Sequence, residues 1–376
     1  MKLRLTIIGL LVLLSVFAPA AAEAHPANGI VADRAGNVYF SDLETIWKLD
    51  TERRLTVFRA GVPGRHVHEL SIDEHDNVYG ADVSYNQTTK GWPSNVWRMT
   101  PEGQFTYLLE TTENPPRGWS IWRDRAGNMY SIEQNNHTKT QTLLLRRSPD
   151  GSVEIHAGGA YGHADGKGSM ARFGSVGGIA FGPDGTLYLA DGAFLRKVTM
   201  DGNVSTLAAD LTRPGSEDSQ RLFGGKYGSL AGLAVDSAGY VYLADSGNRR
   251  VLKVDKEGKV QVVLRSEPPF FPTGAVAAGN DVFVLEVGFT LPNLSSGPRI
   301  RKLGPGGEIA HLATVGAQDP GAESRPSLLT KAGTSAESTL AFLVNDDRMK
   351  YSMTAIGVAI ISAAAFFWRR RRRMRA

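Results

Sequence analysis

One short pattern recurs six times along the 376-residue chain and limits the folds that the chain can adopt. Each copy combines a polar turn, an alternating apolar segment with one aromatic residue, and a closing acid. Alternation with a period of two predicts a β-strand, and turns rich in Asp and Gly favour antiparallel meanders. The copies read DRAGNVYFSD, DEHDNVYGAD, DRAGNMYSIE, GPDGTLYLAD, DSAGYVYLAD and AAGNDVFVLE.

The spacing of these copies predicts the architecture. Their closing acids are 40 to 58 residues apart, and each copy is followed by two more alternating segments. A repeat of this length with four strands per unit is typical of a β-propeller. We therefore predict an all-β fold, a six-bladed β-propeller over residues 25–315, whose ring closes by packing between blades. The closing acids are Asp42, Asp82, Glu133, Asp191, Asp245 and Glu286.

The N-terminus has the features of a secretory signal peptide over residues 1–24. Lys2 and Arg4 precede an apolar segment, Leu5–Phe17, and Ala22-Glu23-Ala24 forms a cleavage site of small residues. This combination predicts export and a mature chain that begins near His25.

The C-terminus predicts a single membrane anchor. Residues 316–350 are small and polar and read as a flexible linker, and residues 351–368 are apolar and long enough to span a bilayer. Residues 369–376 carry six Arg, which favours a cytoplasmic tail. We expect a single-pass protein of the cell membrane with its propeller outside the cytoplasm. The alternative is that the apolar segment and the basic tail form a C-terminal sorting signal that is removed by processing.

Charge and cysteine content limit the function classes. The net charge is +4, but the terminal Arg cluster accounts for it, so the propeller has no excess of positive charge. The high pI therefore does not indicate nucleic-acid binding. The chain has no Cys, so an exported domain must be stable without disulfides.

Two of the predicted blades resemble the NHL repeat. The strings ADSGNRRVLKVDKEG (244–258) and AGGAYGHADGKGSMARFGSVGGIAFGPDGTLYLADG (157–192) resemble its form in bacterial envelope proteins. The resemblance implies a six-bladed propeller. It implies no single activity, because the family includes scaffolds, peptide or RNA readers and a few enzymes.

Several polar residues are expected on the face that carries the longer loops. The closing acids are interpreted as turn caps that accept hydrogen bonds from the backbone that follows them. A central calcium ion, as in lactonase-type propellers, is the alternative interpretation. The histidines His66, His68 and His163 are candidate zinc ligands, because a lyase of this fold holds zinc through histidines of several blades. The long loop over residues 158–176 is expected at the same channel mouth.

Aromatic and amide side chains are dense in the second and third predicted blades. They form a candidate binding rim for a peptide or glycan, because aromatic residues and Arg are enriched at binding sites. The rim residues are Tyr85, Trp92, Arg117, Trp119, Asn135 and Asn136.

The sequence therefore favours a membrane-anchored, extracytoplasmic binding module or scaffold for a protein, peptide or glycan. The alternative is a metal-dependent hydrolase or lyase, resembling a lactonase or a peptidyl-hydroxyglycine lyase, with its site at the channel mouth. That alternative needs a calcium or zinc ion, and the sequence identifies no cofactor of its own.

Overall fold

A computed structural model describes residues 27–84, 86, 88, 93–112, 116–134, 138–214, 230–288 and 296–316. All of these except residues 86 and 88 belong to one compact unit, which spans 25–84 and 92–323. The predicted signal peptide, membrane segment and tail lie outside the described residues, as does the linker except for residue 316. Within the described ranges, no helix has the length and apolar character needed to cross a bilayer.

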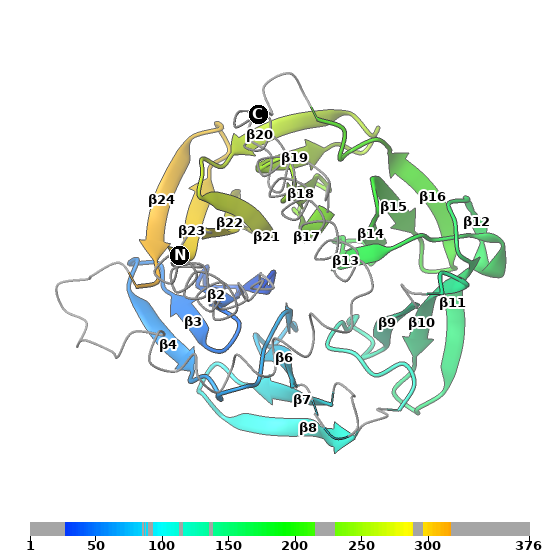
Figure 1. The fold of residues 1–376 in the computed structure, drawn as a ribbon, viewed down its shortest axis with the longest axis horizontal. Coiled ribbons are helices and arrows are strands. Elements are labelled where there is room, and N and C mark those ends of the chain that lie inside the picture. The colour runs from blue at the N-terminus through cyan, green and yellow to red at the C-terminus, as the bar shows by residue number, and fades with distance from the viewer. Residues whose placement is uncertain are drawn as a thin grey trace, which may run out of the picture. The chain divides into compact units, whose positions relative to one another are not determined.

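The described strands form six sheets arranged as the blades of a ring (Figure 1), which confirms the predicted six-bladed β-propeller. Blades 1, 2, 5 and 6 are four-stranded, and neighbouring strands in each are consecutive in sequence. Blade 1 holds β1 (Ile30–Ala32), β2 (Val38–Ser41), β3 (Ile46–Leu49) and β4 (Leu55–Arg59). Blade 2 holds β5 (Leu70–Ile72), β6 (Val78–Val83), β7 (Ser94–Met99) and β8 (Phe105–Thr112). Blade 5 holds β17 (Leu230–Val235), β18 (Val241–Asp245), β19 (Arg250–Val254) and β20 (Val260–Arg265). Blade 6 holds β21 (Phe270–Ala278), β22 (Asp281–Gly288), β23 (Ser296–Leu303) and β24 (Ile309–Thr314).

Blades 3 and 4 depart from four strands. Blade 3 is a three-stranded sheet, and its innermost segment is joined to it by the bridge Arg123↔Met129 and by backbone hydrogen bonds such as that from Tyr130 N to Trp122 O. Its strands are β9 (Met129–Gln134), β10 (Gln141–Arg147) and β11 (Val153–Ala160). Blade 4 has five strands, β12 (Gly166–Lys167), β13 (Val176–Phe181), β14 (Leu187–Asp191), β15 (Phe194–Val198) and β16 (Asn203–Ala208).

The fifth strand of blade 4 comes from the loop over residues 158–176, and its position corrects the expectation for that loop. The loop does not stay at the channel mouth. Instead, β12 pairs with the outer strand β16, and the short 3-10 helix η1 (Gly168–Met170) follows it. Gly168 N donates to Gly202 O, which lies in the turn between β15 and β16. This segment therefore covers the outer edge of blade 4, where strand backbone would otherwise be unpaired.

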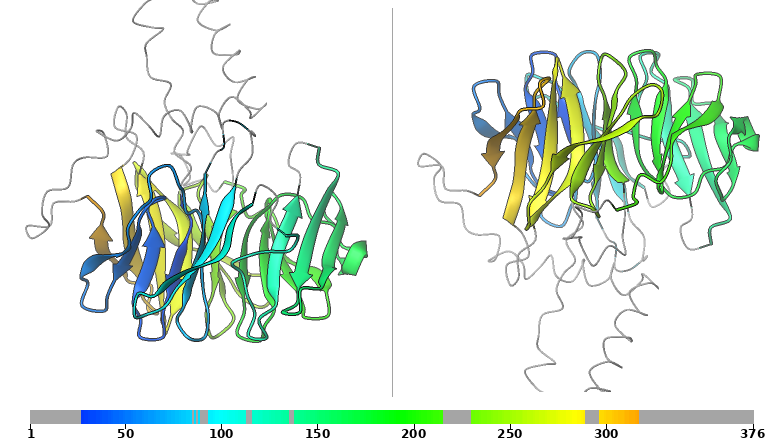
Figure 2. Two further views of the ribbon diagram at one scale, coloured as in Figure 1. Left: turned by 90° about the horizontal axis from the view of Figure 1, so that it is seen from below. Right: turned by 90° about the horizontal axis from the view of Figure 1, so that it is seen from above.

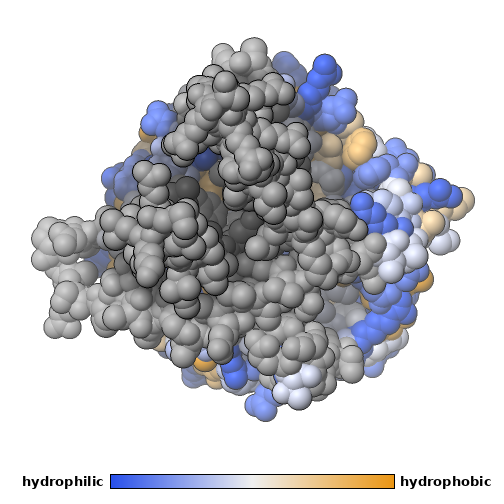
Figure 3. Space-filling view, in the orientation of Figure 1, coloured by the Kyte–Doolittle hydropathy of each residue, from blue (hydrophilic) through white to orange (hydrophobic). Residues whose placement is uncertain are grey.

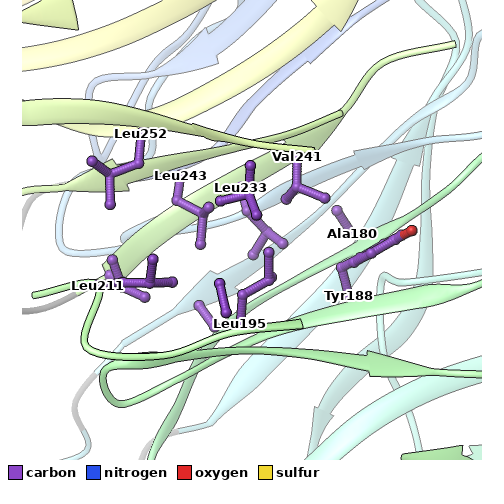
Figure 4. Close-up of a cluster of buried hydrophobic side chains, with 12 residues drawn as sticks. Ala180, Tyr188, Leu195, Leu211, Leu233, Val241, Leu243 and Leu252 are labelled. Atoms are coloured by element: carbon purple, nitrogen blue, oxygen red, sulfur yellow. The ribbon is translucent and has the colours of Figure 1, made fainter. Parts of the chain in front are cut away.

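The two faces of the ring carry different connections (Figure 2). We call the turn face the one with the first-to-second and third-to-fourth strand turns of each blade. The loop face carries the second-to-third strand loops and the links between blades. Six clusters of buried apolar side chains hold the described ring together, one at each junction between neighbouring blades. Figure 4 shows the cluster between blades 4 and 5.

The ring closes by packing, as predicted. Blade 1 is built entirely from the first four strands and blade 6 from the last four, so the two ends share no sheet. Instead Leu285 and Ile300 of blade 6 pack with Phe40 of blade 1 in one cluster. Near the axis, a Cβ atom at Gly274 of β21 would collide with the carbonyl oxygen of Asn28. Glycine therefore allows the backbones of the last and first blades to approach closely.

Candidate functional site

The closing acids act as structural anchors on the loop face. Asp42 accepts hydrogen bonds from Thr45 N at 2.7 Å and from Trp47 Nε1 at 2.7 Å, and Asp245 accepts them from Asn248. Asp82, Asp191 and Glu286 are buried and pair with arginines rather than with following backbone. The interpretation as turn caps therefore holds for Asp42 and Asp245, whereas Asp82, Asp191 and Glu286 are held by arginines.

Arg196 is the centre of one such network. Its guanidinium is 1% exposed and contacts Asp191 at 3.0 Å and Asp165 at 2.9 Å. It also donates to the carbonyl oxygens of Ala164 and Arg172. These contacts fasten the segment that covers blade 4 to the loop face, so the network is structural.

The three candidate zinc ligands do not come together. His66 and His68 lie near each other with ring centroids 6.0 Å apart, but Nδ1 of His163 faces Asp191 at 3.2 Å. Burial lowers the pKa of His66, and nearby Glu44 partly opposes this. In the part of the chain that the structure describes, no group of three or more His, Cys, Asp or Glu is placed to hold a metal ion.

Only part of the candidate rim falls within the described ranges. Arg117 is exposed and forms a two-pronged ion pair with Glu133, at 2.7 and 3.1 Å. Trp119 is half-buried and follows Gly118, whose φ of 80° favours glycine. Tyr85, Trp92, Asn135 and Asn136 lie outside the described residues, so their part in a rim stays a prediction.

The large exposed apolar side chains of the described residues are scattered. The coloured part of Figure 3 is mainly hydrophilic, with scattered hydrophobic side chains. The large exposed apolar residues are spread over blades 2 to 6. They are Phe105, Ile155, Met170, Met200, Tyr240, Val260 and Ile309.

The innermost strands line a small cavity on the axis of the ring, of about 30 Å³, which is room for about two water molecules. One register position is equivalent in all six blades, two residues before the partner of the second-strand aromatic residue, and it lines the cavity in blades 1, 2, 4 and 5. Four blades place glycine there, which keeps the bore narrow. The six residues at this position are Gly29, Glu69, Ser120, Gly178, Gly232 and Gly274.

Glu69 is therefore the acidic exception at a position that favours glycine. Its Oε2 accepts a hydrogen bond from Trp122 Nε1 of blade 3 at 3.3 Å, and the Asn28 side chain is a second donor. Burial raises the pKa of the Glu69 carboxyl, and the two donors only partly oppose this effect. Such a carboxyl can hold a proton closer to neutral pH than an exposed glutamate can.

The residues next to the bore position in blades 2 and 3 surround Glu69. His68 and Trp119 precede the bore position in blades 2 and 3, and Ser120 Oγ accepts a hydrogen bond from Trp122 N. We call His68, Glu69, Trp119, Ser120 and Trp122 the blade 2–3 mouth. It lies where the inner segments of these blades begin, at the loop-face end of the bore.

Sequence reasoning missed Glu69, although a signal for it was present. The inner segments read NGIVAD, HELSID, WSIWRD, GGIAFG, AGLAVD and TGAVAA. When the six segments are aligned on the second-strand aromatic residue, the copy HELSID has Glu69 at the position where four other copies have glycine.

Comparisons with known proteins find similarity only among solved structures. No protein-family model matches the chain, and no curated protein sequence matches it. Among solved structures, virginiamycin B lyase from Staphylococcus aureus is 14% identical with a TM-score of 0.45, over 77% of this chain and 85% of that one. The gluconolactonase XC5397 from Xanthomonas campestris is 15% identical with a TM-score of 0.45, over 70% and 83%. A luciferin-regenerating enzyme is 12% identical with a TM-score of 0.49, over 79% and 95%.

Proposed function

We propose that this chain is a ligand-binding propeller that recognises a peptide or a glycan at the blade 2–3 mouth. The observation that carries the proposal is Glu69, a half-buried acid that lines the bore at a position where four blades have glycine. A carboxyl in that setting lowers the stability of the fold, because its ionised form is poorly solvated. A residue with this cost is expected to have a function that offsets it. Ligand recognition is such a function.

The size of the bore limits how a ligand would bind. A cavity of about 30 Å³ admits a single hydroxyl, amide or ammonium group and no larger part of a molecule. The rest of the ligand would lie across the mouth, where the half-buried Trp119 offers an aromatic surface. Aromatic rings beside a hydrogen-bonding group suit both sugars and peptide side chains.

The setting of this function is proposed from the sequence. The signal peptide, the apolar segment 351–368 and the Arg-rich tail support an extracytoplasmic propeller held at the cell membrane by one helix. The NHL-like strings at 157–192 and 244–258 support membership of that repeat family. A role as a scaffold for neighbouring envelope components fits the same arrangement.

Binding of the full chain, purified in detergent, to arrays of short peptides and of oligosaccharides tests the proposal. Glu69→Gln and Trp119→Ala should reduce the signal at least tenfold. Tyr240→Ala removes an exposed aromatic residue from the turn face and is the matched control. Equal binding by all four proteins would refute recognition at this mouth.

A second candidate function is hydrolysis or β-elimination on a ligand bound at the same mouth. The raised pKa of Glu69 favours it, because a carboxyl that holds its proton more tightly than an exposed glutamate is better suited to act as a general acid. This function predicts turnover that Glu69→Gln abolishes while ligand binding is kept. The binding function predicts that no product forms from any ligand that the arrays identify.

A further inference from the structure

A hydrogen-bonded arrangement repeats on the turn face of four blades. In each, the second-strand Tyr donates its hydroxyl proton to the Asp that lies six residues earlier in the turn. A Lys or Arg lies opposite the Tyr on the third strand. The four pairs are Tyr39–Asp33 at 3.0 Å, Tyr79–Asp73 at 2.8 Å, Tyr130–Asp124 at 3.2 Å and Tyr242–Asp236 at 3.2 Å.

Blade 4 keeps the Tyr and the Lys but lacks the Asp. Gly182 occupies the position six residues before Tyr188, and its backbone has the same hydrogen bonds as the Asp residues of the other turns. Gly182 N donates to Thr186 O, and Gly182 O accepts from Gly185 N, just as Asp33 bonds to Asn37 and Gly36 in blade 1. The turn is thus conserved in shape, and only the carboxylate is missing.

The residues that would contact that carboxylate remain in place. Tyr188 makes no side-chain hydrogen bond with any residue that the structure describes, and Figure 4 shows its hydroxyl pointing away from the apolar cluster. Lys197 lies opposite Tyr188 on β15 and makes no ion pair within the described ranges. Asp184 is nearby, and its charge acts on both Tyr188 and Lys197, but among the described residues it forms no hydrogen bond or ion pair with either. Its Oδ1 accepts a hydrogen bond from Thr186 N of its own turn.

A cavity opens at this point, between blades 4 and 5. Its volume is about 250 Å³, and it is lined by Tyr188 and Lys197 of blade 4 and by Ser237, Gly239 and Lys256 of blade 5. The two lysines outnumber the single lining acid, Asp184, so the cavity favours an anion. Its size suits a small organic molecule.

We propose that this cavity binds the carboxylate of a small organic acid in the place of the missing Asp side chain. The ligand carboxylate would accept the Tyr188 hydroxyl proton, as the protein's own carboxylates do in blades 1, 2, 3 and 5, and it would also face the Lys197 ammonium. Hydrogen bonds between ionised groups of this kind are stronger than neutral ones. The site lies on the turn face, opposite the blade 2–3 mouth, and does not depend on the function proposed for the mouth.

Calorimetric titration of the full chain in detergent, in a carboxylate-free buffer, tests this proposal. The probes are acetate, succinate and citrate, with inorganic phosphate as a different anion. A blocked peptide that contains one Glu tests whether a protein can supply the same carboxylate. We expect at least one carboxylate probe to bind and phosphate to bind at least tenfold more weakly. Equal binding of phosphate, or no binding of any carboxylate, would overturn the assignment.

Two variants locate the site. Gly182→Asp restores the repeat's own carboxylate, and the closest contacts of a Cβ atom there are side-chain atoms, Oδ1 of Asp184 at 3.0 Å and a ring carbon of Tyr188 at 3.1 Å. It should abolish carboxylate binding while the fold is kept. Tyr188→Phe removes only the hydroxyl and should weaken binding at least tenfold. Unchanged affinity in both variants would exclude this cavity, and neither change should affect peptide or glycan binding at the mouth.

Discussion

Trp122 Nε1 of blade 3 donates a hydrogen bond to Oε2 of Glu69 of blade 2, at 3.3 Å, beside the axis of the propeller. This bond joins the two blades that the sequence distinguishes from the others. It also gives the Glu69 carboxyl a hydrogen-bond donor within the narrow bore.

The pH dependence of stability should report on Glu69. Its pKa is raised in the folded protein above the ordinary 4.5, so the folded state binds its proton more tightly than the unfolded state. Below about pH 4.5 the group is protonated in both states and costs nothing. Above that pH, the stability of the wild type falls until the folded carboxyl has ionised.

Glu69→Gln removes this loss because the amide stays neutral. The free energy of unfolding of the variant should exceed that of the wild type by about 1–3 kcal/mol at pH 8 and converge with it at pH 4. Urea denaturation at both pH values measures the difference in unfolding free energy between the variant and the wild type. The other titrating groups are the same in both proteins, so their contributions cancel. Parallel stability curves would contradict a raised pKa.

Replacement of Arg196 should destabilise the propeller strongly. Arg196→Met leaves the buried carboxylate of Asp191 without its main cationic partner, which should cost about 3–5 kcal/mol. Urea denaturation of Arg196→Met, Asp191→Asn and the double variant forms a thermodynamic cycle. The double variant should recover part of the loss. Strictly additive effects would show that the pair is not coupled.

The glycines of the bore should tolerate no larger residue. In Gly232→Ala the new Cβ would lie 2.8 Å from Cα of Gly274 and 3.0 Å from Thr273 O, and backbone cannot yield easily. We expect a loss of about 1–3 kcal/mol of unfolding free energy. Gly306→Ala is the control, because its closest contact is the flexible end of Glu308. Equal stability of the two variants would argue against close backbone packing at the axis.

The C-terminal segment should determine where the protein resides. A chain that ends at Gly316 should be recovered in the soluble extracytoplasmic fraction, whereas the full chain should sediment with membranes. Fractionation of expressing cells, with Edman sequencing to find a mature N-terminus near His25, measures both ends. Recovery of the full chain as a soluble protein would contradict the anchor.

The blades could be predicted because each strand repeats one pattern. Alternation such as TLYLAD fixes which side chains are buried, and the recurring closing acid fixes the register of the copies. Blade 3 was harder, since its inner segment forms a bridge at Arg123 and Met129 in place of a strand. The path of residues 158–176 could not be predicted, because its pairing partner β16 comes later in the chain.

The site could be predicted only in part. Sequence reasoning predicted a binding rim in blades 2 and 3 that includes Trp119. It gave His66, His68 and His163 as an alternative metal site, and both stay predictions. Histidine is a common metal ligand, so residue type alone suggested those positions. Glu69 is identified only by the strand register, which places it in the bore. Gly182 was missed for a similar reason. The missing carboxylate is recognised only when this turn is compared with the equivalent turns of the other blades, which have Asp at that position.

The most direct test of the account is calorimetric titration of the best peptide or oligosaccharide ligand into the wild type and into Glu69→Gln. If the bore carboxyl takes part in recognition, the dissociation constant of the variant should rise at least tenfold, which is about 1.4 kcal/mol. An unchanged dissociation constant in a folded variant would contradict the assignment of the blade 2–3 mouth as the ligand site.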